Sequence, residues 1–133
     1  MIKDCKLIAE KNNIKFKFNS YFPIRSLNLM RGVLVAEEDN IKNYYIDNIF
    51  NTIWQDGLNM NDEIIIQKVL KNLNANPKTF ALRSTSSLIK DSLRKKTTEA
   101  YEKGIFGAPT FVVNNKIFWG QDRLEFALKE ASK

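Results

Sequence analysis

The chain has 133 residues, of which 44% are hydrophobic and 27% charged, and this length is sufficient for one domain with a buried core. No apolar run approaches the roughly 18 residues of a membrane helix, and residues 1–20 carry charges throughout, so we expect a cytoplasmic protein without a membrane partner. The net charge of +6 suits nucleic acid, but the lysines and arginines are spread over the sequence, and we expect no nucleic-acid partner.

The first part of the chain is predicted to be mainly helical. Residues 1–11 indicate a helix with an apolar face, on which Cys5 is expected to be packed and inert. The alternation of polar and apolar residues in Lys15–Asn19 indicates a short strand. Apolar periodicity and start signals then predict helices from Ser26 onward and over residues 41–54, 61–73 and 77–82.

The last third of the chain is predicted to hold a long helix, a hairpin and a closing helix. The long helix covers residues 86–103 and ends at Gly104, a glycine C-cap. The β-rich runs Thr110–Val113 and Lys116–Trp119 are separated by two asparagines, which favour a two-residue hairpin turn. The closing helix is expected to bury a stripe formed by Leu124, Ala127, Leu128 and Ala131.

Cysteine and histidine content excludes several kinds of chemistry. The single cysteine, Cys5, allows neither an intramolecular disulfide nor a Cys-x-x-Cys redox centre within this chain. The absence of histidine removes Ser–His and Cys–His catalysis and histidine-ligated metal sites. We therefore expect no metal site and no disulfide exchange by this chain acting alone.

The segment 104–124 carries most of the functional information, and two interpretations of it remain open. Pro109 at the mouth of a strand removes a backbone donor, and Asp122 is expected at the start of the last helix. An open backbone edge beside a carboxylate would suit a peptide-like ligand with an amino group. Alternatively, Asp122 and Glu125 form a helix-capping box, and Pro109 simply begins a strand.

Two motifs in this segment resemble a known family. Residues 104–111, Gly-Ile-Phe-Gly-Ala-Pro-Thr-Phe, and 118–124, Phe-Trp-Gly-Gln-Asp-Arg-Leu, are similar to the C-terminal signature of the 2-hydroxychromene-2-carboxylate isomerase family. Residues 21–27 and 35–38 add weaker likeness. This family is grouped with kappa-class glutathione transferases in the DsbA-like branch of thioredoxin folds.

The resemblance implies an α/β, thioredoxin-like (DsbA-like) fold with a helical insertion. Residues 1–133 would form a single domain, in which 1–19 and 104–133 make the thioredoxin part and 20–103 the mainly helical insertion. Members of the family begin with a strand and a loop that bears a catalytic serine. By this resemblance the chain is N-terminally truncated, and we expect no catalytic residue within it.

The resemblance also implies glutathione as cofactor. Pro109 should follow a cis peptide bond, and the backbone of Ala108 should pair with the cysteinyl part of glutathione. Asp122 should form a salt bridge with the amino group of the γ-glutamyl end. The segment that holds this end is matched by Trp119, Gly120, Gln121 and Asp122.

Ile24 and Arg25 match the family's segment near the organic substrate, an aromatic carboxylate. Arg25 stands where asparagine is usual in the family. Its guanidinium would either hold a substrate carboxylate with two hydrogen bonds or point into water.

The implied function is glutathione-dependent cis–trans isomerisation of an aromatic catabolite, a hydroxychromene carboxylate that becomes an open-chain pyruvate. As this chain lacks the serine, we expect an incomplete or inactive isomerase-like protein. The alternative is a non-catalytic scaffold with a thioredoxin fold that binds glutathione or a protein. Relatives commonly form dimers, so the resemblance also implies a homodimer.

Overall fold

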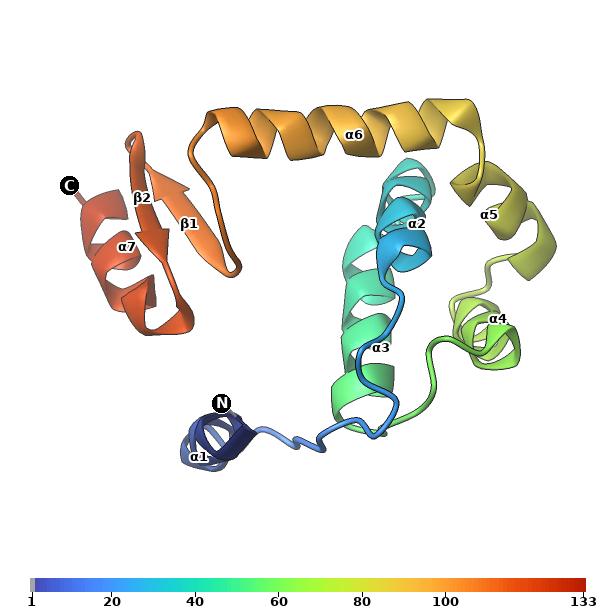
Figure 1. The fold of residues 1–133 in the computed structure, drawn as a ribbon, viewed down its shortest axis with the longest axis horizontal. Coiled ribbons are helices and arrows are strands. Elements are labelled where there is room, and N and C mark those ends of the chain that lie inside the picture. The colour runs from blue at the N-terminus through green and yellow to red at the C-terminus, as the bar shows by residue number, and fades with distance from the viewer. Residues whose placement is uncertain (1) are drawn as a thin grey trace. The chain divides into compact units, whose positions relative to one another are not determined.

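The computed structural model describes residues 2–133, which form mostly helices and one small sheet (Figure 1). The chain divides into two compact units, Met1–Leu93 and Arg94–Lys133. Helix α6 continues across the boundary between them. The elements in chain order are α1 (Ile2–Lys11), α2 (Leu27–Glu38), α3 (Lys42–Trp54), α4 (Glu63–Asn72), α5 (Pro77–Ser84), α6 (Ser87–Glu102), β1 (Thr110–Val113), β2 (Lys116–Trp119), the 3-10 helix η1 (Gln121–Arg123) and α7 (Leu124–Ala131).

The first unit is built around a helical core. Helix α2 packs against α3 and α5, and α4 packs against α3 and α5 (Figure 1). On α3 the buried residues Tyr45, Ile49 and Ile53 recur every four positions, which places them on one face of the helix. The core cluster of buried side chains comprises Leu29, Leu34, Val35, Ala36, Tyr45, Ile49, Ile53, Met60, Val69, Leu70, Phe80 and Ile89.

Helices α2 and α3 meet at Gly32, where there is no room for a side chain. A β-carbon at Gly32 would lie 2.8 Å from Cζ of Tyr45 and 3.1 Å from Cε1 of Phe80. The Tyr45 hydroxyl is buried and donates a hydrogen bond of 3.1 Å to the carbonyl of Leu29. Burial raises the pKa of this hydroxyl. The glycine therefore allows the tyrosine ring to cross between the two helices.

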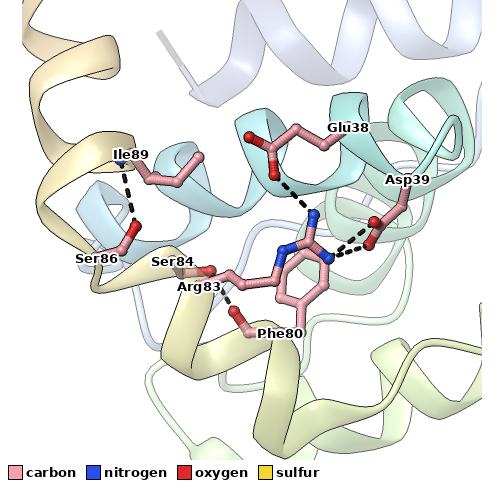
Figure 2. A network of polar contacts seen from close by, with 7 residues as sticks. All are labelled: Glu38, Asp39, Phe80, Arg83, Ser84, Ser86 and Ile89. Carbon is pink, nitrogen blue, oxygen red and sulfur yellow. Dashed lines mark hydrogen bonds and ion pairs between the residues drawn. The ribbon is translucent and has the colours of Figure 1, made fainter.

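Arg83 on α5 connects that helix to the end of α2 (Figure 2). Its Nη1 donates to both carboxylate oxygens of Asp39, at 2.8 and 2.9 Å, and its Nη2 donates to Oε2 of Glu38 at 2.7 Å. The hydrogen bonds to Glu38 and Asp39 raise the pKa of the guanidinium. Figure 2 shows the guanidinium between the two carboxylates, so one side chain joins two adjacent acidic residues.

The predicted strand Lys15–Asn19 is not formed, because the described residues place no strand beside it. The segment is extended without a sheet partner, and the Lys17 amide donates to the carbonyl of Trp54 at 2.6 Å. Asn19 is fully buried at its end. Its Nδ2 donates to the carbonyls of Ile53 and Leu58, at 3.0 and 2.8 Å, and its Oδ1 accepts from the Tyr21 amide. A polar side chain thus fixes this segment against the end of α3.

The second unit is a hairpin with α7 packed against it (Figure 1). It follows the end of α6, where Gly104 has a φ of +78°. The Gly104 amide donates to Tyr101 and the Ile105 amide to Ala100, which is the Schellman arrangement. The glycine C-cap predicted at this position is therefore confirmed.

Glu130 of α7 is the polar centre of the second unit. Its side chain accepts from Nζ of Lys133 at 2.7 Å and from Nζ of Lys116 at 2.9 Å, and its carbonyl accepts from Asn114. The hydrogen bonds from Lys133 and then Lys116 lower the pKa of Glu130 to about 2. The polar and charged contacts of Glu130 hold α7 against the hairpin.

Two packing expectations are wrong. Cys5 is exposed, because the apolar face of α1 is largely uncovered in the described residues: Leu7 is exposed and only Ala9 is buried. Of the stripe predicted on α7 only Ala127 is buried; Leu124, Leu128 and Ala131 are exposed, because the helix contacts the hairpin through the face of Ala127 and Glu130 instead. Met1, the first residue of the predicted N-terminal helix, lies outside the described residues.

No helix within residues 2–133 is both long and apolar enough to cross a membrane.

Candidate functional site

The candidate site is built on the antiparallel hairpin of β1 and β2. Thr110 pairs with Trp119 and Val113 with Lys116, as predicted. Asn114 and Asn115 form the turn with φ angles of 49° and 60°. Two successive positive φ values are typical of the turn whose twist suits a two-residue hairpin. Asparagine tolerates this region better than most residues, which explains why the sequence folds back here.

The peptide bond between Ala108 and Pro109 is cis, as expected from the resemblance. The carbonyl of Pro109 accepts a hydrogen bond of 2.9 Å from the amide of Gly120. This bond extends the hairpin pairing one step beyond Thr110 and Trp119. It brings the segment before β1 and the segment after β2 to the same end of the hairpin.

Ala108 presents an open backbone at this end. The residue is exposed, and within residues 2–133 no group forms a hydrogen bond with its amide or its carbonyl. A backbone with an unpaired donor and acceptor can add an extended chain by main-chain hydrogen bonds. The Ala108 backbone is therefore unpaired within the described residues, and its contact with a ligand stays a prediction.

Trp119 forms an aromatic surface beside this backbone. Its ring lies 5.2 Å from the ring of Phe106, centroid to centroid, and 53% of the residue is exposed. A β-carbon on Gly107 would lie within 3.2 Å of Cδ1 of Trp119, so only glycine permits this approach. Phe106 and Gly107 were not singled out in the sequence, although Gly107 directly precedes the Ala-Pro pair.

Gly120 and Asp122 form the turn that leaves β2. Gly120 has a φ of +108°, which a residue with a side chain rarely adopts. A β-carbon at Gly120 would also lie 2.6 Å from Oδ1 of Asp122. The glycine thus lets the Asp122 carboxylate lie over the backbone at the end of the hairpin.

The capping role considered for Asp122 and Glu125 is not observed. Asp122 lies inside η1, and Gly120 and Arg123, at the N-caps of η1 and α7, form no side-chain cap bond. The carboxylate of Asp122 is exposed, and Nη1 of Arg123 is 3.9 Å from its Oδ2. Gln121 is also exposed in the same turn. Asp122 is therefore available to a ligand rather than used by the helix.

A shallow hollow of about 280 Å³ adjoins this turn. The hollow is lined by Trp119, Arg123 and Phe126 and by two other residues of β2. The Arg123 guanidinium lies 5.6 Å from the centre of the Phe126 ring, a cation–π arrangement. Arg123 was not predicted as a site residue; its position directly after Asp122 was the available signal.

The predicted substrate residues Ile24 and Arg25 lie in the other compact unit, Met1–Leu93. Ile24 is half-buried and packs against the helical core. Arg25 is exposed, and its amide donates to Oδ1 of Asn61 at 2.8 Å. The structure brings together the six residues predicted for glutathione on the second unit, whereas the substrate residues form a separate pair on the first.

Residues 2–133 contain no group of three or more histidine, cysteine, aspartate or glutamate side chains placed to hold a metal ion.

Comparison with known proteins agrees with this architecture. The DSBA-like thioredoxin domain family matches residues 1–131. A solved structure of 2-hydroxychromene-2-carboxylate isomerase superposes with a TM-score of 0.85 at 24% identity, over 97% of this chain and 62% of that chain. These matches confirm the predicted DsbA-like thioredoxin fold.

Sequence relatives carry the same name. A 2-hydroxychromene-2-carboxylate isomerase of Sphingobium xenophagum is 26% identical over 126 residues, which cover 95% of this chain and 64% of the relative. One of Pseudomonas putida is 29% identical over 128 residues, which cover 96% of this chain and 62% of the relative. The chain thus spans less than two thirds of the length of these relatives.

Proposed function

Because this chain belongs to the DSBA-like thioredoxin domain family, we propose that it binds glutathione on its hairpin and serves the isomerisation of an aromatic carboxylate. The observation that carries the proposal is the shared name of its relatives, 2-hydroxychromene-2-carboxylate isomerase, which match 95% and 96% of the chain. A cytoplasmic location belongs to the same proposal, since the reducing cytosol is where glutathione keeps thiols free. The proposal also includes a homodimer.

The residues at the end of the hairpin suit glutathione chemically. Glutathione is a short peptide with an extended backbone, and Ala108 offers an unpaired amide and carbonyl for it. Its γ-glutamyl end carries an ammonium group, and the exposed Asp122 carboxylate supplies the opposite charge. Gly120 has no side chain that would collide with this carboxylate.

Each part of the chain has a binding task in this proposal. Bound glutathione would supply a thiol that adds reversibly to the conjugated substrate, so that a double bond becomes free to rotate. Asp122 would hold the γ-glutamyl end and the Ala108 backbone the cysteinyl part, so that the peptide is kept in one orientation. Trp119 would cover one side of it with an aromatic ring, and Arg25 would hold the substrate carboxylate through its guanidinium.

Glutathione binding to the purified chain, measured by calorimetry, tests the proposal. We expect Asp122→Ala to weaken binding by at least about tenfold, because a hydrogen bond to a charged group is worth ~1.5–3 kcal/mol. Glu125→Ala is the matched control, since Glu125 is exposed one turn further along and should leave binding unchanged. Equal binding by the native chain and Asp122→Ala would contradict the assignment of this site.

A second assay separates the isomerase from a scaffold. The absorbance of 2-hydroxychromene-2-carboxylate is followed with the chain present, with and without glutathione. Conversion that requires glutathione would support the isomerase. Glutathione binding without conversion would instead favour the non-catalytic scaffold with the same ligand site.

A further inference from the structure

A larger cavity lies within the helical unit, and none of the residues assigned to the glutathione and substrate sites lines it. It has a volume of about 600 Å³ and is lined by residues of α2, α3, α4 and α5 and of the segments next to α5. All of its lining residues lie between positions 28 and 85, and thus within the first compact unit. Small-molecule sites commonly occupy ~300–1,000 Å³, so the cavity has the size of a ligand site.

The inner wall of the cavity is apolar. Leu29, Leu70 and Phe80 are buried residues that line it, and Ile66 is half-buried. The buried hydroxyl groups in the wall already donate inside the protein: Tyr45 to the carbonyl of Leu29, and Ser84 to the carbonyl of Phe80 at 2.9 Å. Since these hydroxyl protons are engaged and the buried wall is otherwise apolar, the inner wall favours the apolar part of a ligand.

Positive charge prevails among the charged residues that line this cavity. Lys71 of α4 and Lys78 of α5 are exposed, and within the described residues neither forms an ion pair. Glu63, at the start of α4, is the one acidic residue in the lining. Two ammonium groups against one carboxylate favour an anionic group at the surface of the cavity.

We infer that this cavity binds a carboxylate with an apolar body, which places its chain or ring against Leu29, Leu70 and Phe80 and its charge near Lys71 and Lys78. The apolar wall and the excess of positive charge each restrict the ligand, and together they specify an amphiphilic anion. This inference is independent of the glutathione site, because it uses none of the hairpin residues.

The test is titration of the isotope-labelled chain with two probes, decanoate and 2-naphthoate, followed by amide chemical shifts. The first probe has a flexible chain and the second an aromatic ring, so the two arms tell which body the cavity accepts. We expect saturable shifts at Leu70, Phe80 and Ser84 with at least one probe. No shift with either probe, or shifts confined to residues 106–123, would overturn the inference.

Charge variants test the position of the carboxylate. Lys71→Gln and Lys78→Gln should each weaken binding about threefold, as expected for exposed ion pairs. Lys68→Gln is the matched control, because Lys68 is exposed on α4 but does not line the cavity. Equal weakening by Lys68→Gln, or equally tight binding of the neutral probe 1-decanol, would refute a specific carboxylate site.

A filled cavity provides an independent check. Ala81 is exposed on α5 and lines the cavity, so Ala81→Leu should occupy part of the space without removing a core side chain. We expect at least a fivefold loss of probe binding with an unchanged thermal midpoint. Undiminished binding by the folded variant would show that the probe binds elsewhere.

Discussion

The helical unit Met1–Leu93 contains all twelve residues of the core cluster, whereas Arg94–Lys133 buries only Ala127 and Glu130 among its described residues. Several large apolar residues of the second unit stay exposed: 73% of Phe106, 53% of Trp119 and 56% of Phe126. The first unit is held by side-chain packing, and the second by backbone pairing and the charges around Glu130.

Because of this difference, the residues that stabilise the fold are largely separate from the residues that are candidates for ligand binding. The exposed aromatic residues Phe106, Trp119 and Phe126 lie beside the candidate ligand residues, so their apolar area is present at the site instead of in a core. Segments with few buried contacts are the first to open in a folded protein. The hairpin unit should therefore respond to charge and ligand, and the helical unit to changes of volume and buried polarity.

The largest effect is expected from Asn19→Ala in the helical unit. The change leaves the carbonyl of Ile53 without its partner in a buried place, and the carbonyl of Leu58 and the amide of Tyr21 without theirs in a partly buried one. The loss in the free energy of unfolding should be about 3 kcal/mol, measured by urea denaturation. Asn43→Ala, an exposed change on α3, should stay within about 0.5 kcal/mol. Similar losses in both variants would contradict the stabilising role of the buried Asn19 contacts in the helical unit.

Gly32→Ala should have the next largest effect. Its new methyl group would collide with the buried ring of Tyr45, and overpacking of this kind costs ~1–3 kcal/mol. Alanine is the better helix former by ~1 kcal/mol, so the net loss should be about 0–2 kcal/mol. Tyr45→Phe removes the hydroxyl that meets this methyl, and the double variant should lose less than the sum of the two single ones. Strict additivity in urea denaturation would contradict the contact.

The smallest effect concerns the hairpin unit and depends on pH. The pKa of Glu130 is lowered in the folded state, so its stabilising effect is complete above the ordinary glutamate pKa and disappears as the pH falls toward about 2. The native chain should therefore exceed Glu130→Gln in thermal stability at pH 6, and this difference should vanish between about pH 4.5 and 2. Glu125→Gln should show no comparable change. If the difference in thermal stability between the native chain and Glu130→Gln stayed constant with pH, the ion pairs of Glu130 with Lys116 and Lys133 would be disproved.

Elements with local signals were predicted closely. Both strands have the predicted bounds, because β-rich runs around two asparagines specify a hairpin without help from distant residues. The end of α6 at Gly104 and the start of α5 at Pro77 were likewise marked by residues whose backbone preferences act locally. The six candidate ligand residues came together for the same reason, since all of them lie in one segment of fifteen positions that contains the hairpin.

Features that depend on distant partners were not predicted. Asn19 is held by carbonyls 34 and 39 positions away, and no local sequence pattern indicates these hydrogen bonds. The alternation in Lys15–Asn19 is typical of a strand, yet a strand forms only when another lies beside it. Cys5 and Leu124 were expected to be buried because they lie in apolar patterns, but periodicity identifies a face and not what covers it.

The Arg83 contact has a consequence for the order in which the first unit becomes complete. The last turn of α2 contains acidic residues and no basic one, and Asp39 follows as its C-cap, so this helix ends in charges that its own dipole disfavours. Arg83 relieves the conflict from 44 positions further along the chain. A long loop must close before that can happen. The end of α2 is therefore unfavourable as an isolated helix end. It should become stable only when α5 is also folded, which makes the two helices one cooperative element.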